Sequence, residues 1–89
     1  MPSRDFEIIN ELGMHARAAA EFTRMASGFQ AGIFVTRDGM EVNGKSIMGL
    51  LMLAAHTGSV IGVRAEGDDA DAALDALQGL VENRFGEEK

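Results

Sequence analysis

The sequence of 89 residues contains no cysteine. This absence excludes disulfides, thiol nucleophiles and thiolate metal sites, and it fits a reducing compartment. No apolar run approaches the roughly 20 residues of a membrane-spanning helix. The first residues are not followed by the apolar core of a signal peptide. We therefore expect a cytoplasmic protein without membrane insertion.

Nucleotide-binding motifs are also absent, since neither GxxxxGK[ST] nor GxGxxG occurs. The sequence thus offers no cradle for ATP or for a dinucleotide. Its two histidines, His15 and His56, lie far apart without clustered carboxylates beside them, which is weak support for a metal site. We expect neither a metal nor another cofactor, and we interpret His56 as a surface turn residue.

Basic residues are scarce: 8 lysines and arginines stand against 14 acids, which gives a net charge of −6. Such an acidic chain is a poor candidate for nucleic-acid binding, because that binding depends on neutralising phosphates. The acids gather in residues 66–75, which contain five acids and no base. Arg17, Arg24 and Lys45 would form a local basic patch if they shared a face.

The length and the hydrophobic fraction of 46% favour one folded domain over residues 1–89. The periodicity of apolar residues predicts the order β-α-β-β-α-β-α. We expect strands at 4–9, 33–37, 40–43 and 60–65, and helices at 16–27, 47–54 and from a cap at Asp68 or Asp69 through Arg84 to Gly86. The strands are amphipathic, so an α+β fold is predicted, with helices on one face of the sheet.

Four local features complete this expectation. Asp38-Gly39 indicates a type I′ hairpin turn. Gly28 is a plausible stop for the first helix. Glu21 can bridge Arg17 and Arg24 along that helix. Residues 87–89 are expected to fray.

The strongest candidate for chemistry is His15, which stands where the strand-like pattern stops and the first helix begins. Backbone N–H groups at a helix start lack internal partners and attract anions. A neutral imidazole offers a nucleophilic nitrogen, and Arg17 could pair with phosphoryl oxygens. His15 is therefore a candidate phosphoryl acceptor. The alternative is that His15 only caps the helix and that Arg17 only pairs with Glu21.

The second candidate region is the short helix after Ser46, a favoured N-cap residue. This helix is apolar nearly all round, so part of it should be exposed and could contact other proteins. The residues expected at this docking surface are Ile47, Met48, Leu51 and Met52. The alternative is a helix that is simply buried.

Two segments, Gly13-Met14-His15-Ala16-Arg17-Ala18-Ala19 and Lys45-Ser46-Ile47-Met48-Gly49-Leu50, resemble HPr, the histidine-containing phosphocarrier of the bacterial phosphotransferase system. The resemblance covers essentially the whole chain. It implies an open-faced β-sandwich of four antiparallel strands with three helices on one face. The family usually has proline where this chain has Ala18, and often leucine where it has Met14.

The resemblance also implies roles for single residues. His15 would be phosphorylated on Nδ1 by enzyme I and would pass the group to an enzyme IIA domain, with Arg17 assisting. Ser46 would be phosphorylated by an HPr kinase/phosphorylase. Arg24, Lys45 and the apolar residues after Ser46 would belong to the partner-docking surface. The protein would act as a monomer.

One alternative is a regulatory HPr-like module, including one in a nitrogen-type phosphotransferase branch, that works by binding proteins and carries little phosphoryl flux. Another is a small metal- or RNA-binding α+β domain, which the charge and the lack of ligand clusters disfavour.

Overall fold

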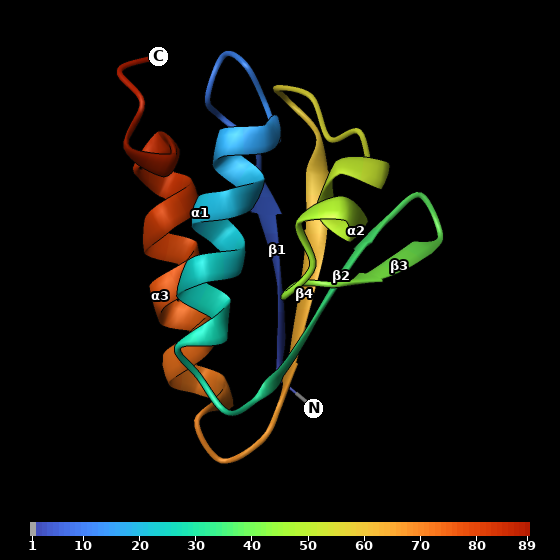
Figure 1. The fold of residues 1–89 in the computed structure, drawn as a ribbon, viewed down its shortest axis with the longest axis vertical. Coiled ribbons are helices and arrows are strands. Elements are labelled where there is room, and N and C mark those ends of the chain that lie inside the picture. The colour runs from blue at the N-terminus through green and yellow to red at the C-terminus, as the bar shows by residue number, and fades with distance from the viewer. Residues whose placement is uncertain (1) are drawn as a thin grey trace.

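The structure, a computed structural model, describes residues 2–89 and confirms the predicted order of elements (Figure 1). The strands are β1 (Ser3–Glu7), β2 (Gly32–Arg37), β3 (Met40–Asn43) and β4 (Val60–Glu66), and the helices are α1 (Ala16–Ser27), α2 (Ile47–Met52) and α3 (Ala70–Glu82), followed by a short 3₁₀ turn, η1 (Arg84–Gly86). The fold is the expected open-faced sandwich, with the helices on one face of the sheet. No helix in residues 2–89 is both long enough and apolar enough to cross a membrane.

The four strands form one antiparallel sheet in the order β1-β4-β2-β3. The β2–β3 hairpin turns at Asp38 and Gly39, whose φ angles of 52° and 82° are those of a type I′ turn. Alternate residues of β2 and β4 are buried, as expected for a sheet with one covered face.

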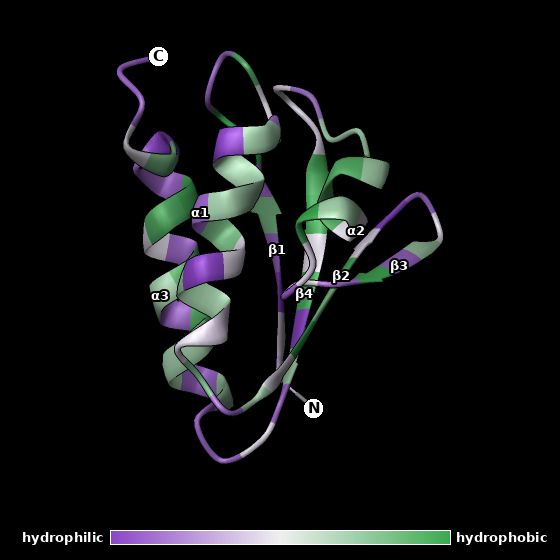
Figure 2. Cartoon of the chain, viewed as in Figure 1, coloured by the Kyte–Doolittle hydropathy of each residue, from purple (hydrophilic) through white to green (hydrophobic). Residues whose placement is uncertain are grey.

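The core lies between that face and the helices. Hydrophobic and hydrophilic segments alternate along α1 and α3 (Figure 2), which is the pattern of helices packed on one side only. Alanines and Phe22 face the core from α1, and Leu74, Leu77 and Val81 do so from α3. The short α2 contributes one fully buried side chain, Leu50.

Several predicted boundaries were wrong. β1 ends at Glu7 instead of residue 9, although the Ile8 N–H still donates to the Ser59 carbonyl at 2.8 Å. α2 ends at Met52 instead of residue 54, because Ala54 adopts a left-handed φ of 50° that a helix does not continue through. α3 likewise ends at Glu82, since Arg84 has a φ of 55°.

Two predicted end signals work differently from the expectation. Gly28 does follow α1, but its φ of −74° is right-handed, so no left-handed stop occurs there. Asp69 is the N-cap residue of α3, yet its side chain makes no capping bond. Its carboxylate instead accepts the backbone N–H groups of Gln30 and Ala31, each at 2.8 Å. Asp69 therefore fastens the α1–β2 connection to the start of α3.

We predict that Asp69→Asn destabilises the protein at neutral pH but has little effect in acid. The Gln30 N–H bond, opposed by burial and helped by the Ala31 N–H bond, holds the pKa of Asp69 below its ordinary value of 3.8. A lowered folded-state pKa adds stability that is complete above the ordinary pKa and is lost as the pH falls through the folded-state pKa.

Urea unfolding at neutral pH and well below pH 3.8 would measure the difference between the two proteins. Asp68→Asn, a change at the exposed neighbour, is the control. A difference of equal size at both pH values would contradict this role of Asp69.

Candidate functional site

His15 is the N-cap residue of α1, as predicted, with extended backbone angles (φ −83°, ψ −179°). Its carbonyl accepts the Ala19 N–H at 2.8 Å, and its ring Nδ1 accepts the Arg17 N–H at 3.3 Å. A side chain that caps a helix in this way satisfies one of the free donors of the first turn. Nδ1 therefore lies at the positive end of α1. Ala18 is buried in the same first turn, so alanine fits where the family usually has proline.

The loop before His15 is held from both sides. Met14 is buried and its N–H donates to the Ala55 carbonyl at 2.8 Å. Gly13 has a φ of +70°, and a Cβ there would lie 2.8 Å from the Ala55 oxygen and from the His56 Cα. Only glycine allows this close approach of two backbone segments. Asn10 is fully buried and donates from Nδ2 to the Gly13 carbonyl at 2.8 Å.

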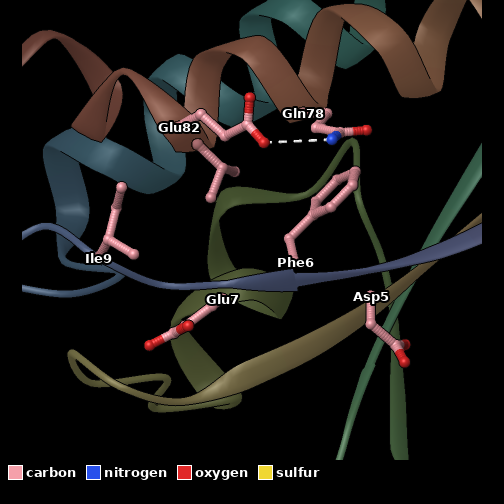
Figure 3. Close-up of a pocket in the computed structure, with 7 residues that line it drawn as sticks. Asp5, Phe6, Glu7, Ile9, Gln78 and Glu82 are labelled. Atoms are coloured by element: carbon pink, nitrogen blue, oxygen red, sulfur yellow. Dashed lines mark hydrogen bonds between the residues drawn. The ribbon is translucent and has the colours of Figure 1, made fainter.

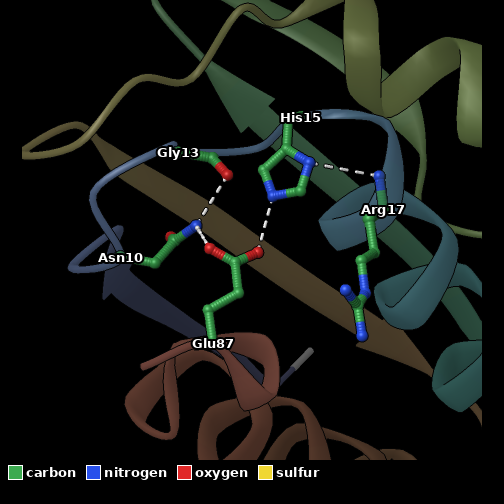
Figure 4. A network of polar contacts seen from close by, with 5 residues as sticks. All are labelled: Asn10, Gly13, His15, Arg17 and Glu87. Atoms are coloured by element: carbon green, nitrogen blue, oxygen red, sulfur yellow. Dashed lines mark hydrogen bonds and ion pairs between the residues drawn. The ribbon is translucent and has the colours of Figure 1, made fainter. Parts of the chain in front are cut away.

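Glu87 reaches the other ring nitrogen of His15, which the sequence did not lead us to expect. Its Oε2 lies 2.5 Å from His15 Nε2, and its Oε1 accepts a hydrogen bond from Asn10 Nδ2 at 3.0 Å (Figure 4). The Lys89 carbonyl also accepts the Glu11 N–H at 2.9 Å. The prediction that residues 87–89 fray was therefore wrong: these residues are bound to the loop that carries His15.

The charges around Glu87 keep its carboxylate ionised. Burial would raise the pKa of Glu87, but the hydrogen bonds from Asn10 and His15 and the nearby charge of Arg17 outweigh it, so the pKa lies below its ordinary value. Arg17 extends from the same end of α1, alongside the His15–Glu87 pair (Figure 4). The ring is thus placed between the start of a helix and an anionic side chain.

Ser46 is the N-cap of α2, as predicted, and its Oγ accepts the Gly49 N–H at 3.1 Å. However, it does not lie beside His15. Thr23 Oγ1 donates to the neighbouring Gly44 carbonyl at 3.4 Å, and Thr23 is eight residues along α1 from His15, or about 12 Å at 1.5 Å per residue. The segment after α2 is the part that adjoins the His15 loop, through the bond to Ala55.

The three basic residues do not form one patch. Lys45 donates from Nζ to the Phe29 carbonyl at 2.8 Å, beyond the end of α1. Arg24 pairs with Glu21, and in residues 2–89 no hydrogen bond or ion pair joins Glu21 to Arg17 as well. Arg17 and Arg24, seven positions apart, still share one face of α1.

The expectation that α2 exposes apolar side chains is confirmed for three residues, Ile47, Met48 and Met52, which we call the apolar patch; Met48 is 70% exposed. Leu51 is partly buried against the core. Leu12, in the loop before His15, is also 69% exposed, and this exposure was not predicted. No periodic pattern marks an exposed loop residue of this kind.

Other parts of the surface are poorer candidates. A pocket of about 290 Å³ lies between β1 and α3 (Figure 3). Its polar lining includes Asp5, Glu7 and Glu82, which would repel a phosphoryl group. His56 is exposed, and within residues 2–89 no group of three or more histidines and acids is arranged to hold a metal.

The chain is similar to several known phosphocarrier proteins. A family model described as "PTS HPr component phosphorylation site" matches residues 2–83. The phosphocarrier protein HPr of Cupriavidus necator is 48% identical over 87 residues, which cover 98% of each chain. A crystal structure of HPr-C-His from Thermoanaerobacter tengcongensis matches with a TM-score of 0.96 and 46% identity, covering 100% of both chains. An HPr dimer from the same organism matches with a TM-score of 0.79 at 46% identity, covering 98% of this chain and 100% of that one.

The fold and the relatives define a phosphocarrier, which is a protein that relays a phosphoryl group and is not itself an enzyme. The chain belongs to the HPr family of the phosphotransferase system.

We predict that Gly13→Ala destabilises the protein more than Gly39→Ala does. Both glycines have a positive φ, which costs alanine roughly 1–2 kcal/mol, but a Cβ at Gly39 meets nothing within 4 Å. At Gly13 the methyl group also collides with the backbone at Ala55 and His56. Urea unfolding measures the loss of stability in each variant, and the difference between the two losses gives the cost of the collision at Gly13. Equal losses of stability would show that the close approach at Gly13 is unimportant.

Proposed function

We propose that His15 accepts a phosphoryl group on Nδ1 from enzyme I and passes it to an enzyme IIA domain. The observation that carries this proposal is the position of Nδ1 at the start of α1, beside the Arg17 N–H. Amide groups at a helix N-terminus can bind phosphoryl oxygens. Without a nucleotide cradle of its own, the protein depends on a partner for the phosphoryl group.

The chemistry needs positioning and charge stabilisation more than covalent catalysis. The lone pair of Nδ1 attacks phosphorus while the bond between phosphorus and the donor's nitrogen or oxygen breaks, and the electron pair leaves with the donor. The phosphoryl oxygens then accept hydrogen bonds from the first amides of α1. Arg17, which starts on the same turn, pairs with their negative charge.

The docking surface combines the apolar patch with the exposed face of α1 that carries Arg17 and Arg24. An apolar centre with basic residues beside it suits a partner of the opposite pattern, apolar with an acidic rim. Leu51 and Lys45 contribute less to it, because Leu51 is partly buried against the core and Lys45 donates to the Phe29 carbonyl. Because its proposed phosphoryl donor, enzyme I, is itself charged from phosphoenolpyruvate inside the cell, we place the protein in the cytoplasm. It would work there as a monomer, so that partner proteins can reach His15.

Ser46 is the proposed regulatory site, phosphorylated by an HPr kinase/phosphorylase. A phosphate would add about −1.5 to −2 charges directly before the exposed Ile47 and Met48. The helix start tolerates negative charge, so the fold would remain. A partner whose surface is acidic would be repelled.

We predict that His15→Ala abolishes labelling when the protein is incubated with enzyme I and phosphoenolpyruvate carrying labelled phosphate. The nucleophilic nitrogen is then missing, whereas His56→Ala removes an exposed histidine and should keep full labelling. Acid-labile label on the His15→Ala protein would refute the site. Labelling of the wild type without transfer to any enzyme IIA would instead favour a regulatory module.

We predict that Ser46→Asp raises the KM of enzyme I for this protein several-fold without lowering its thermal stability. Aspartate remains a good N-cap, so α2 persists while its charge acts on the docking partner. Ser46→Ala loses the cap, at a cost of about 1 kcal/mol, and should keep the wild-type KM. A Ser46→Asp protein phosphorylated as well as the wild type would contradict regulation through charge.

A further inference from the structure

The proposed transfer of a phosphoryl group to Nδ1 gives no role to the contact between Glu87 and His15 Nε2. We propose that Glu87 is a positioning residue: it fixes His15 in the tautomer with hydrogen on Nε2 and neutralises the ring charge that arises when Nδ1 takes a phosphoryl group. This proposal rests on the proposed function of His15 and adds the residue that prepares it.

The geometry fixes the carboxylate on both of its oxygens. Oε2 faces His15 Nε2 at 2.5 Å, and Oε1 accepts from Asn10 Nδ2 at 3.0 Å. The same Asn10 nitrogen donates to the Gly13 carbonyl at 2.8 Å. Because both of these neighbours are acceptors, the amide nitrogen of Asn10 must face them. Glu87 is therefore attached to the loop that carries the imidazole.

The His15–Glu87 pair is largely shielded from water. The side chains of His15 and Glu87 are 29% and 15% exposed, and Asn10 is completely buried. A second bond, from the Glu11 N–H to the Lys89 carbonyl at 2.9 Å, ties the residues after Glu87 to the same loop. A hydrogen bond to a charged acceptor is stronger than a neutral one, and more so when water is excluded.

The two ring nitrogens of His15 have opposite surroundings. Nδ1 faces a donor, the Arg17 N–H, and Nε2 faces an acceptor, the Glu87 carboxylate (Figure 4). A neutral imidazole satisfies both only with its hydrogen on Nε2 and its lone pair on Nδ1. The other tautomer would set a hydrogen against the Arg17 N–H and a lone pair against a carboxylate. Glu87 thus selects the nitrogen at the start of α1 as the nucleophile.

The same contact serves the transfer itself. When Nδ1 forms its bond to phosphorus, the donor's bond to phosphorus breaks and the donor keeps that electron pair. The ring retains its hydrogen on Nε2 and becomes positively charged, opposite the negative charge of Glu87. When the phosphoryl group moves on, the N–P electron pair returns to Nδ1 and the ring is neutral again. Neither step requires a proton to leave, so the carboxylate favours uptake of the phosphoryl group and holds the ring ready for the next cycle. A carboxylate plays the corresponding part beside the histidine of serine proteases.

Glu87→Gln is the direct test, because glutamine keeps the size of the side chain and loses its charge. Glu88→Gln, at the exposed neighbour, is the matched control. Nitrogen-15 NMR of the unphosphorylated proteins reads the tautomer of His15, and stopped-flow assays with enzyme I give the phosphorylation rate.

We expect a His15 ring with hydrogen on Nε2 in the wild type and in Glu88→Gln, and a mixture of tautomers in Glu87→Gln. We expect the rate of Glu87→Gln to fall roughly 10- to 100-fold, the loss typical when a group that orients a functional histidine is removed. A merely structural role would change stability without moving the tautomer.

The proposal is overturned if wild-type His15 carries its hydrogen on Nδ1, or if Glu87→Gln changes neither the tautomer nor the rate. The position of the hydrogen on His15 is measured on the wild-type protein, so it tests the proposal even if Glu87→Gln fails to fold. Failure of the phosphocarrier function is a different result: label on the His15→Ala protein, whatever the tautomer.

Discussion

The proposed chemistry depends on an imidazole that is held at both of its nitrogens. Nδ1 of His15 caps α1, and Nε2 meets the carboxylate of Glu87. A histidine held at one nitrogen could still rotate or change tautomer, whereas two unlike partners define both the ring orientation and the position of the hydrogen. The nucleophilic nitrogen is thereby fixed where helix amides can receive a phosphoryl group.

The rest of the fold supplies these two partners from opposite ends of the sequence. The antiparallel sheet carries α1 and α3 side by side, and α3 delivers the segment with Glu87 to the loop before α1 (Figure 1). Gly13 lets that loop pack directly on the backbone at Ala55. The same contact joins this loop to the segment that follows α2, through the Met14 N–H bond to the Ala55 carbonyl.

The sequence correctly predicted the features that depend only on residues close together in the chain. The change of period at residue 16 located His15 as a cap, Asp38-Gly39 predicted the hairpin, and Ser46 predicted the start of α2. Two features that the sequence did not predict depend on distant partners. Glu87 acts 72 positions from His15, and no periodicity encodes such a contact. The predicted capping role of Asp69 was wrong for the same reason, because the N–H groups that its carboxylate accepts lie before β2 and not in its own helix.

The position of the phosphoryl group on the ring tests the proposed role of His15 most directly. Nitrogen-15 and phosphorus-31 NMR of the protein phosphorylated by enzyme I would read it without any mutation. We expect phosphorus bound to Nδ1 of His15, with the hydrogen retained on Nε2 beside Glu87. Phosphorus bound to Nε2 would contradict it, because the group would then occupy the place that Glu87 holds in this structure.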